Sequence, residues 1–159
     1  MAVMTNLSQY EIERNKPMPN FIHAVIQTKL STLLNNDYGK KYLFPGELSL
    51  ATQPSSTLDI CIYPKKKLKR AGVKAKEEEP PITTIEIQSP SQSIDQLQEK
   101  IRDLYFPMGV KSAWIVIPAL KGIQILLEDG QELFFHKSQL KDPTTDISID
   151  IQRVFEDFE

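Results

Sequence analysis

Apolar residues recur at spacings of three and four over two stretches of the chain, and this period predicts two amphipathic helices. The first helix is expected over residues 20–36, where Asn20 can cap the first turn. The second is expected to follow a cap at Ser93 or Asp95 and to run to about Met108. The apolar faces consist of Phe21, Ile22, Val25, Ile26, Leu30, Leu33 and Leu34 in the first helix, and Ile94, Leu97, Ile101, Leu104 and Tyr105 in the second.

Short apolar stretches bounded by turn residues predict the β-strands. The strands are expected from about Gly46 to Leu50, at 58–63, 82–88 and 112–117, and as a hairpin of 122–127 with 132–135 around Asp129-Gly130. The strands at 82–88 and 112–117 are joined through the second helix, so they should be parallel neighbours. This order of elements predicts an α+β fold with a mixed sheet flanked by helices.

Three segments fit no clear element. Residues 1–20 are polar, and Pro17 and Pro19 predict an extended lead-in to the first helix. Residues 64–81 have no apolar face and predict an exposed, mobile loop between two strands. The apolar positions between Ile147 and Phe155 fit either a strand or a short helix.

Composition narrows the class of protein. The 159 residues are enough for one domain spanning 1–159, and the net charge of −2 argues against binding nucleic acid through bulk charge. A single cysteine, Cys61, excludes an intramolecular disulfide, and with two histidines it excludes a Cys/His zinc cluster. No apolar run reaches the roughly 20 residues of a membrane helix, and the N-terminus does not read as a secretory signal. We therefore expect a soluble cytoplasmic protein that does not contact membranes.

Two carboxylates lie inside apolar strands, Asp59 in LDICIY and Glu86 in TIEIQS. Both acids alternate with apolar neighbours, so the outer face of the sheet could expose them to solvent. If the two strands are adjacent, both acids could instead converge on one Mg²⁺ or Mn²⁺ ion, which prefers hard oxygen ligands. Gln88 would then share the face of Glu86, and Lys100 on the second helix could reach it.

The order of several motifs resembles the PD-(D/E)xK nuclease core and, more closely, the Uma-type family of restriction-endonuclease-like proteins. The resemblance covers roughly residues 10–127. It is carried by His23, by Leu58-Asp59, by Glu86-Ile87-Gln88-Ser89-Pro90-Ser91, by Lys100, by Tyr105-Phe106-Pro107-Met108-Gly109-Val110, and by Trp114-Ile115-Val116-Ile117-Pro118.

The resemblance implies a Mg²⁺-dependent DNA endonuclease in which Asp59 and Glu86 hold the metal. Gln88 stands where such nucleases usually have a lysine, and the resemblance implies that Lys100 takes over that charge. His23 is a further candidate, either for supporting a residue that holds the metal or for facing the substrate, although a histidine that begins a helix is more often a surface or capping residue. Glu47 is a candidate third carboxylate, although it also reads as an exposed acid at a strand end.

Further expectations concern partners. The resemblance implies a homodimer, because each site cuts one strand, and the apolar C-terminal hairpin is a candidate contact between copies. The basic run could touch DNA phosphates, or it could be a solvated loop balanced by Glu77-Glu78-Glu79. Its candidate phosphate contacts are Lys65, Lys66, Lys67, Lys69 and Arg70.

Two other hypotheses remain open at this point. In the first, the chain keeps a nuclease fold without activity and binds nucleic acid or protein, as the replacement of lysine by Gln88 suggests. In the second, the strand acids form structural salt bridges with Lys100 or Arg102 and no metal binds.

Overall fold

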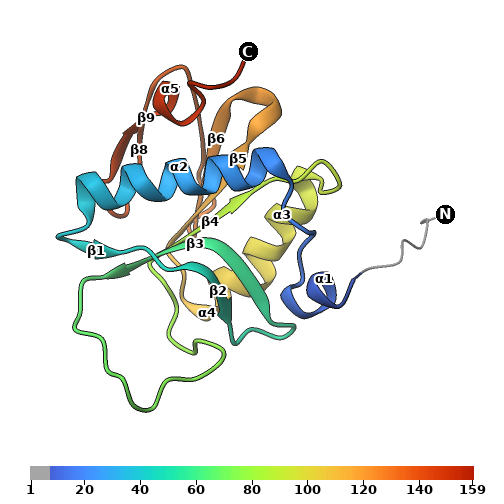
Figure 1. The fold of residues 1–159 in the computed structure, drawn as a ribbon, viewed down its shortest axis with the longest axis vertical. Coiled ribbons are helices and arrows are strands. Elements are labelled where there is room, and N and C mark those ends of the chain that lie inside the picture. The colour runs from blue at the N-terminus through green and yellow to red at the C-terminus, as the bar shows by residue number, and fades with distance from the viewer. Residues whose placement is uncertain (1–7) are drawn as a thin grey trace.

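A mixed β-sheet forms the centre of the protein in a computed structural model that describes residues 8–159 (Figure 1). The strands of this seven-stranded sheet run in the order β1-β3-β4-β5-β6-β7, and β2 pairs with the other end of the β3 edge. Only β4 and β5 are parallel, as expected for strands joined through a helix. The strands are β1 (Tyr42–Leu43), β2 (Gly46–Leu50), β3 (Ser56–Pro64), β4 (Thr83–Ile87), β5 (Ser112–Ile117), β6 (Gly122–Leu127) and β7 (Glu132–His136).

Helices cover both faces of this sheet (Figure 1). The long helix α2 packs on one face together with a C-terminal unit that consists of a small two-stranded sheet and one turn of helix. The helix after β4 packs on the other face. The remaining elements are α1 (Gln9–Arg14), α2 (Phe21–Tyr38), α3 (Ile94–Lys100), the π-helix η1 (Ile101–Tyr105), α4 (Phe106–Met108), the 3₁₀ turn η2 (Pro118–Leu120), β8 (Gln139–Lys141), β9 (Ser148–Asp150) and α5 (Ile151–Val154).

Alternate residues of the central strands fill two separate cores. In β5, Trp114 and Val116 point to the face of α2, whereas Ala113 and Ile115 point to the face of α3. All four side chains are fully buried, as a period of two predicts for a strand covered on both sides. The sheet is therefore a rigid base on which polar side chains can be held in place.

The two long helices, the mixed sheet and the β6–β7 hairpin confirm the sequence-based predictions. The ambiguous C-terminal stretch contains both alternatives, the strand β9 followed by the helical turn α5. Cys61 is a buried free thiol, and burial raises the pKa of its thiol far above the usual range. None of the helices within residues 8–159 is long and apolar enough to cross a membrane.

The sequence pattern did not predict α1, β1 or β8. The polar lead-in contains the short helix α1, which Ser8 caps through a reciprocal hydrogen-bond pair with Glu11. Helix α1 buries none of its own residues, so the sequence has no apolar period from which this helix could be predicted. The prediction of an extended lead-in over residues 1–20 is therefore wrong at Gln9–Arg14, and its part at 1–7 lies outside the described residues. Pro17 and Pro19 connect α1 to α2.

The loop between β3 and β4 is exposed along its basic part, residues 65–76, as predicted. The prediction of a mobile loop is not met at its acidic end, where Glu77 is hydrogen-bonded to the sheet. Glu77 pairs with the edge of β2, where its backbone nitrogen donates to Ser49 and its carbonyl accepts from Ala51. The loop therefore extends the sheet locally, and in Figure 1 it swings away from α1.

Candidate active site

Asp59 of β3 and Glu86 of β4 lie next to each other on adjacent antiparallel strands. Ile60 pairs with Ile85 in the register of these strands, so Asp59 and Glu86 occupy the facing positions one step further along. Asp59 is 2% exposed and Glu86 is 4% exposed. The interpretation that these acids face solvent is therefore wrong, because helices and the N-terminal segment cover both sides of the sheet.

Asp59 accepts hydrogen bonds from three groups. Lys16 Nζ lies 2.7 Å from its Oδ1, while His23 Nε2 at 3.1 Å and the backbone nitrogen of Ile87 at 2.7 Å contact its Oδ2. Burial alone would raise the pKa of Asp59, but the hydrogen bond from His23 and the charge of Lys16 outweigh it and lower this pKa. Asp59 is therefore held as a carboxylate.

Lys16 is the residue of this site that the sequence pattern missed. Its ammonium lies 2.7 Å from Asp59 Oδ1 and 2.8 Å from Glu47 Oε2. Burial would lower the pKa of Lys16, but the two carboxylates raise it, so Lys16 stays charged. One lysine in a polar, proline-containing lead-in gives no periodic signal, and only the fold shows that it points inward.

Glu47 enters the site through an unusual backbone geometry. It lies within β2 with a φ angle of 52°, the left-handed region that non-glycine residues seldom adopt. Strained backbone of this kind is concentrated at functional sites. Its carboxylate is 38% exposed and still reaches Lys16, so the expectation of a strand-end acid is only partly met.

Glu86 is contacted by side chains of α3 and η1, whereas Asp59 is contacted by side chains of the N-terminal segment and α2. Lys100 Nζ lies 3.3 Å from Glu86 Oε1, and the Tyr105 hydroxyl donates to the same oxygen at 3.0 Å. Burial and the neighbouring Glu86 raise the pKa of Tyr105, so its proton stays in place. The second oxygen, Glu86 Oε2, is buried and has no hydrogen-bond partner among residues 8–159.

The π-helix η1 explains how Lys100 and Tyr105 reach the same oxygen. Residues five apart on an α-helix point about 140° apart, because each residue turns the chain by roughly 100°. Here Phe106 donates its backbone hydrogen bond to Ile101, and the wider turn brings Lys100 and Tyr105 onto the same side. Single π-turns inside α-helices are frequent at functional sites.

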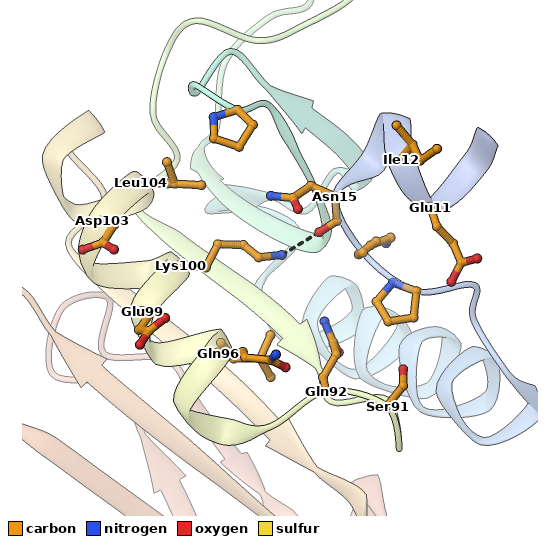
Figure 2. Close-up of a pocket in the computed structure, with 14 residues that line it drawn as sticks. Glu11, Ile12, Asn15, Ser91, Gln92, Gln96, Glu99, Lys100, Asp103 and Leu104 are labelled. Atoms are coloured by element: carbon orange, nitrogen blue, oxygen red, sulfur yellow. Dashed lines mark hydrogen bonds between the residues drawn. The ribbon is translucent and has the colours of Figure 1, made fainter. Parts of the chain in front are cut away.

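An open groove of about 950 Å³ lies between α1 and α3 (Figure 2). Figure 2 shows Glu11 and Asn15 on one side of it and Glu99 and Lys100 on the other, with Lys100 Nζ donating to the Asn15 carbonyl at 2.9 Å.

A second cavity of about 10 Å³ lies deeper and is lined by His23, Asp59 and Glu86. A space of this volume is at the lower limit for one water molecule. Lys16, Pro17 and Gln92 line both the cavity and the groove, so they form the wall between the acids and the open groove.

The oxygen atoms at this site are of the kind that binds a hard divalent cation, but they are not grouped around one position as metal ligands are. Two carboxylates and the unpartnered oxygen Glu86 Oε2 are the ligand type that Mg²⁺ and Mn²⁺ prefer. Within residues 8–159, however, no three His, Cys, Asp or Glu side chains are grouped to hold a metal. A positive charge does lie between Asp59 and Glu47, and it is the Lys16 ammonium.

The other predicted residues divide into those near the acids and those away from them. His23 is 4% exposed, and its Nδ1 is buried without a partner among the described residues. Gln88 lies just past β4, and its amide nitrogen donates to the Gln92 carbonyl, so the structure does not place this amide against Glu86. Arg102 pairs with the exposed Glu132 rather than with either buried acid.

The basic loop residues lie away from the acids. Lys65 follows the far end of β3, six residues from Asp59, or roughly 20 Å at ~3.3 Å per residue. Lys65 donates to the Gly39 carbonyl, and Lys66 pairs with Glu79. Lys67, Lys69 and Arg70 are exposed.

Comparisons with known proteins agree with this architecture. A family model described as "Uma2: Putative restriction endonuclease" matches residues 3–152. A crystal structure of a putative nuclease belonging to DUF820 from Anabaena variabilis ATCC 29413 superposes with a TM-score of 0.75 at 19% sequence identity, covering 88% of this chain and 83% of that one. No curated protein matches the sequence. At this level of identity the crystal structure supports the fold alone.

Proposed function

The chain belongs to the Uma2 family of putative restriction endonucleases, and from this premise we propose that it is a Mg²⁺- or Mn²⁺-dependent DNA endonuclease. One observation carries the proposal. Asp59 and Glu86 occupy facing positions on two adjacent strands, both are buried, and one oxygen of Glu86 has no partner among residues 8–159. A buried carboxylate oxygen without a partner is costly for stability, and such sites are often retained for function.

Asp59 and Glu86 are the residues that would hold the metal. Bound there, Mg²⁺ would supply a Lewis acid that lowers the pKa of a water molecule and offsets charge on the phosphate to be cleaved. Asp59 is already ionised, as a metal ligand must be. Glu47 would be a third carboxylate near the metal, and it is linked to Asp59 through Lys16, which contacts both.

Lys100 and His23 have supporting roles in this proposal. Lys100 brings an ammonium to Glu86 and so provides, from the helix, the positive charge that Gln88 cannot provide from the strand. His23 lies with its Nε2 3.1 Å from Asp59 Oδ2 and so fixes the orientation of that carboxylate. Gln88 would act through its hydrogen bond to Gln92, which lines the small cavity.

The test is cleavage of supercoiled plasmid DNA with Mn²⁺, with Mg²⁺ and with EDTA. We expect metal-dependent nicking by the native protein and a loss of at least a hundredfold in Asp59→Asn and in Glu86→Gln. Glu132→Gln is the matched control, because it also removes one carboxylate but lies on the surface in an ion pair with Arg102. Absence of nicking by the folded native protein with either metal would refute the proposal.

A second candidate function follows from the ion pairs at the site. Lys16 and Lys100 already neutralise the two acids, as they would in a nuclease fold that has lost its activity and binds nucleic acid or protein. This alternative predicts binding of a labelled DNA duplex without cleavage, weakened by salt. Replacing Lys67, Lys69 and Arg70 together by glutamine tests whether the exposed loop contributes, with fluorescence anisotropy as the readout.

A further inference from the structure

The N-terminal segment Ser8–Pro19 reaches the acids through a single buried side chain. In the stretch 8–20, Lys16 is the one buried residue, and α1 buries none. Besides those of Lys16, the hydrogen bonds that join the segment to the rest of residues 8–159 are made by Asn15. Asn15 donates to the Ser56 hydroxyl at 3.2 Å, and its carbonyl accepts from Lys100.

A segment held in this way has low local stability. Regions with few buried apolar contacts open at a free energy far below that of global unfolding. The contact of Lys16 with Asp59 and Glu47 is therefore the main buried anchor of Ser8–Pro19. The 950 Å³ groove alongside the segment leaves its polar face open to solvent.

Lys16 also occupies the position that a cation at these acids would need. Its ammonium touches Asp59 Oδ1, the carboxylate oxygen that Ile87 and His23 leave for other partners. A divalent ion on that oxygen and an ammonium 2.7 Å from it would repel each other in a poorly hydrated site. The same side chain, with Pro17 and Gln92, separates the acids from the groove.

We propose that Lys16 is a built-in competitor for the metal, so that a divalent ion enters by displacing its ammonium from Asp59 and thereby releases the segment Ser8–Pro19. This inference rests on the proposed metal site at Asp59 and Glu86. It adds that metal affinity is set by the N-terminal segment. The groove beside Lys16 is lined by three acids, Glu11, Glu99 and Asp103, and by one further lysine, Lys100, so its acidic excess favours entry of a cation along this side.

The first test measures binding of Mn²⁺ alone by the loss of the free-ion signal in electron paramagnetic resonance. We expect Lys16→Met to bind Mn²⁺ at least tenfold more tightly than the native protein. Lys16→Arg keeps the charge and should bind no more tightly than native. Lys111→Met, which removes an exposed lysine paired with Glu128, is the control and should match the native protein.

The second test follows amide hydrogen exchange in the native protein. Saturating Mn²⁺ should speed exchange at Gln9–Lys16 by at least fivefold and leave β4 and β5 unchanged. In Asp59→Asn, Mn²⁺ should leave the exchange of this segment unaltered. This measurement needs no Lys16 variant, so it decides the matter if Lys16→Met and the more conservative Lys16→Gln both fail to fold.

The possible results separate this inference from the proposed function. Equal or weaker Mn²⁺ binding by a folded Lys16→Met, or unchanged exchange of Gln9–Lys16 in the metal-bound native protein, overturns the competitor role while leaving the metal site intact. An absence of binding in both the native protein and Lys16→Met overturns both proposals. Tighter binding in the variant together with faster exchange supports both.

Discussion

Lys16 pairs with Asp59 and Lys100 pairs with Glu86, but the two lysines lie on segments that are packed very differently against the core. Lys100 ends α3 and precedes η1, on a helix whose Leu97 and Ile101 are packed in the core. Lys16 is carried by a short segment with no other buried residue between 8 and 20. The same charge is thus fixed on one side of the site and removable on the other, because only Lys100 is backed by buried apolar surface.

The acids differ in a corresponding way. Asp59 has three partners, and of these Lys16 lies on the segment with the least buried surface. Glu86 has two partners on one oxygen and none among residues 8–159 on the other. This asymmetry suggests that the Glu86 side is preorganised, whereas the Asp59 side must rearrange before it can take a new ligand.

Replacing each lysine in turn tests most directly whether Lys16 and Lys100 differ in this way. Lys100→Met should lower the free energy of unfolding by about 3 kcal/mol, because it leaves the buried Glu86 without its cation. Lys16→Met should cost about 1 kcal/mol, because the segment can swing out and Asp59 keeps His23 and the Ile87 amide. Urea denaturation in EDTA measures both values. Equal losses of unfolding free energy in the two variants would show that the segments carrying Lys16 and Lys100 are held equally firmly.

Tyr105→Phe sharpens the description of the Glu86 side. The hydroxyl donates to a buried carboxylate, and hydrogen bonds to charged groups contribute about 1.5–3 kcal/mol. We expect a loss of about 2 kcal/mol in the same denaturation experiment. Tyr63→Phe is the control, since its hydroxyl donates to the neutral Glu79 carbonyl, and a loss of about 1 kcal/mol is expected there. A loss in Tyr105→Phe no larger than in the control would contradict this role.

The smallest effect is expected at Asn15. This residue ends α1 with a φ angle of 54°, so glycine keeps the backbone geometry and removes only the hydrogen bond to Ser56. Asn15→Gly should change the free energy of unfolding by less than about 1 kcal/mol while speeding amide exchange across α1 alone. Faster exchange that spread into β3 would show that the segment is coupled to the sheet more strongly than its contacts suggest.

Much of the fold could be predicted because apolar periods report directly on burial. The faces of α2 and α3 and the apolar run of β5 carry that signal, and so does the hairpin turn at Asp129-Gly130. The period of two could not decide whether Asp59 and Glu86 face solvent, since both faces of this sheet are covered. The strand pattern offered the pairing of these acids as one of two alternatives, the resemblance to a nuclease family favoured it, and the structure showed that both acids are buried.

The sequence by itself determined the long helices, the central strands with their two acids, and the parallel neighbours β4 and β5, because these depend on local spacing and short connections. It did not determine α1, β1 or β8. Only the tertiary structure decided which cation meets which acid. Lys16 lies 43 residues from Asp59 along the chain, and its contact depends on how a polar segment folds back. The shared contact of Lys100 and Tyr105 likewise depends on one wide helical turn, which no hydrophobic pattern encodes.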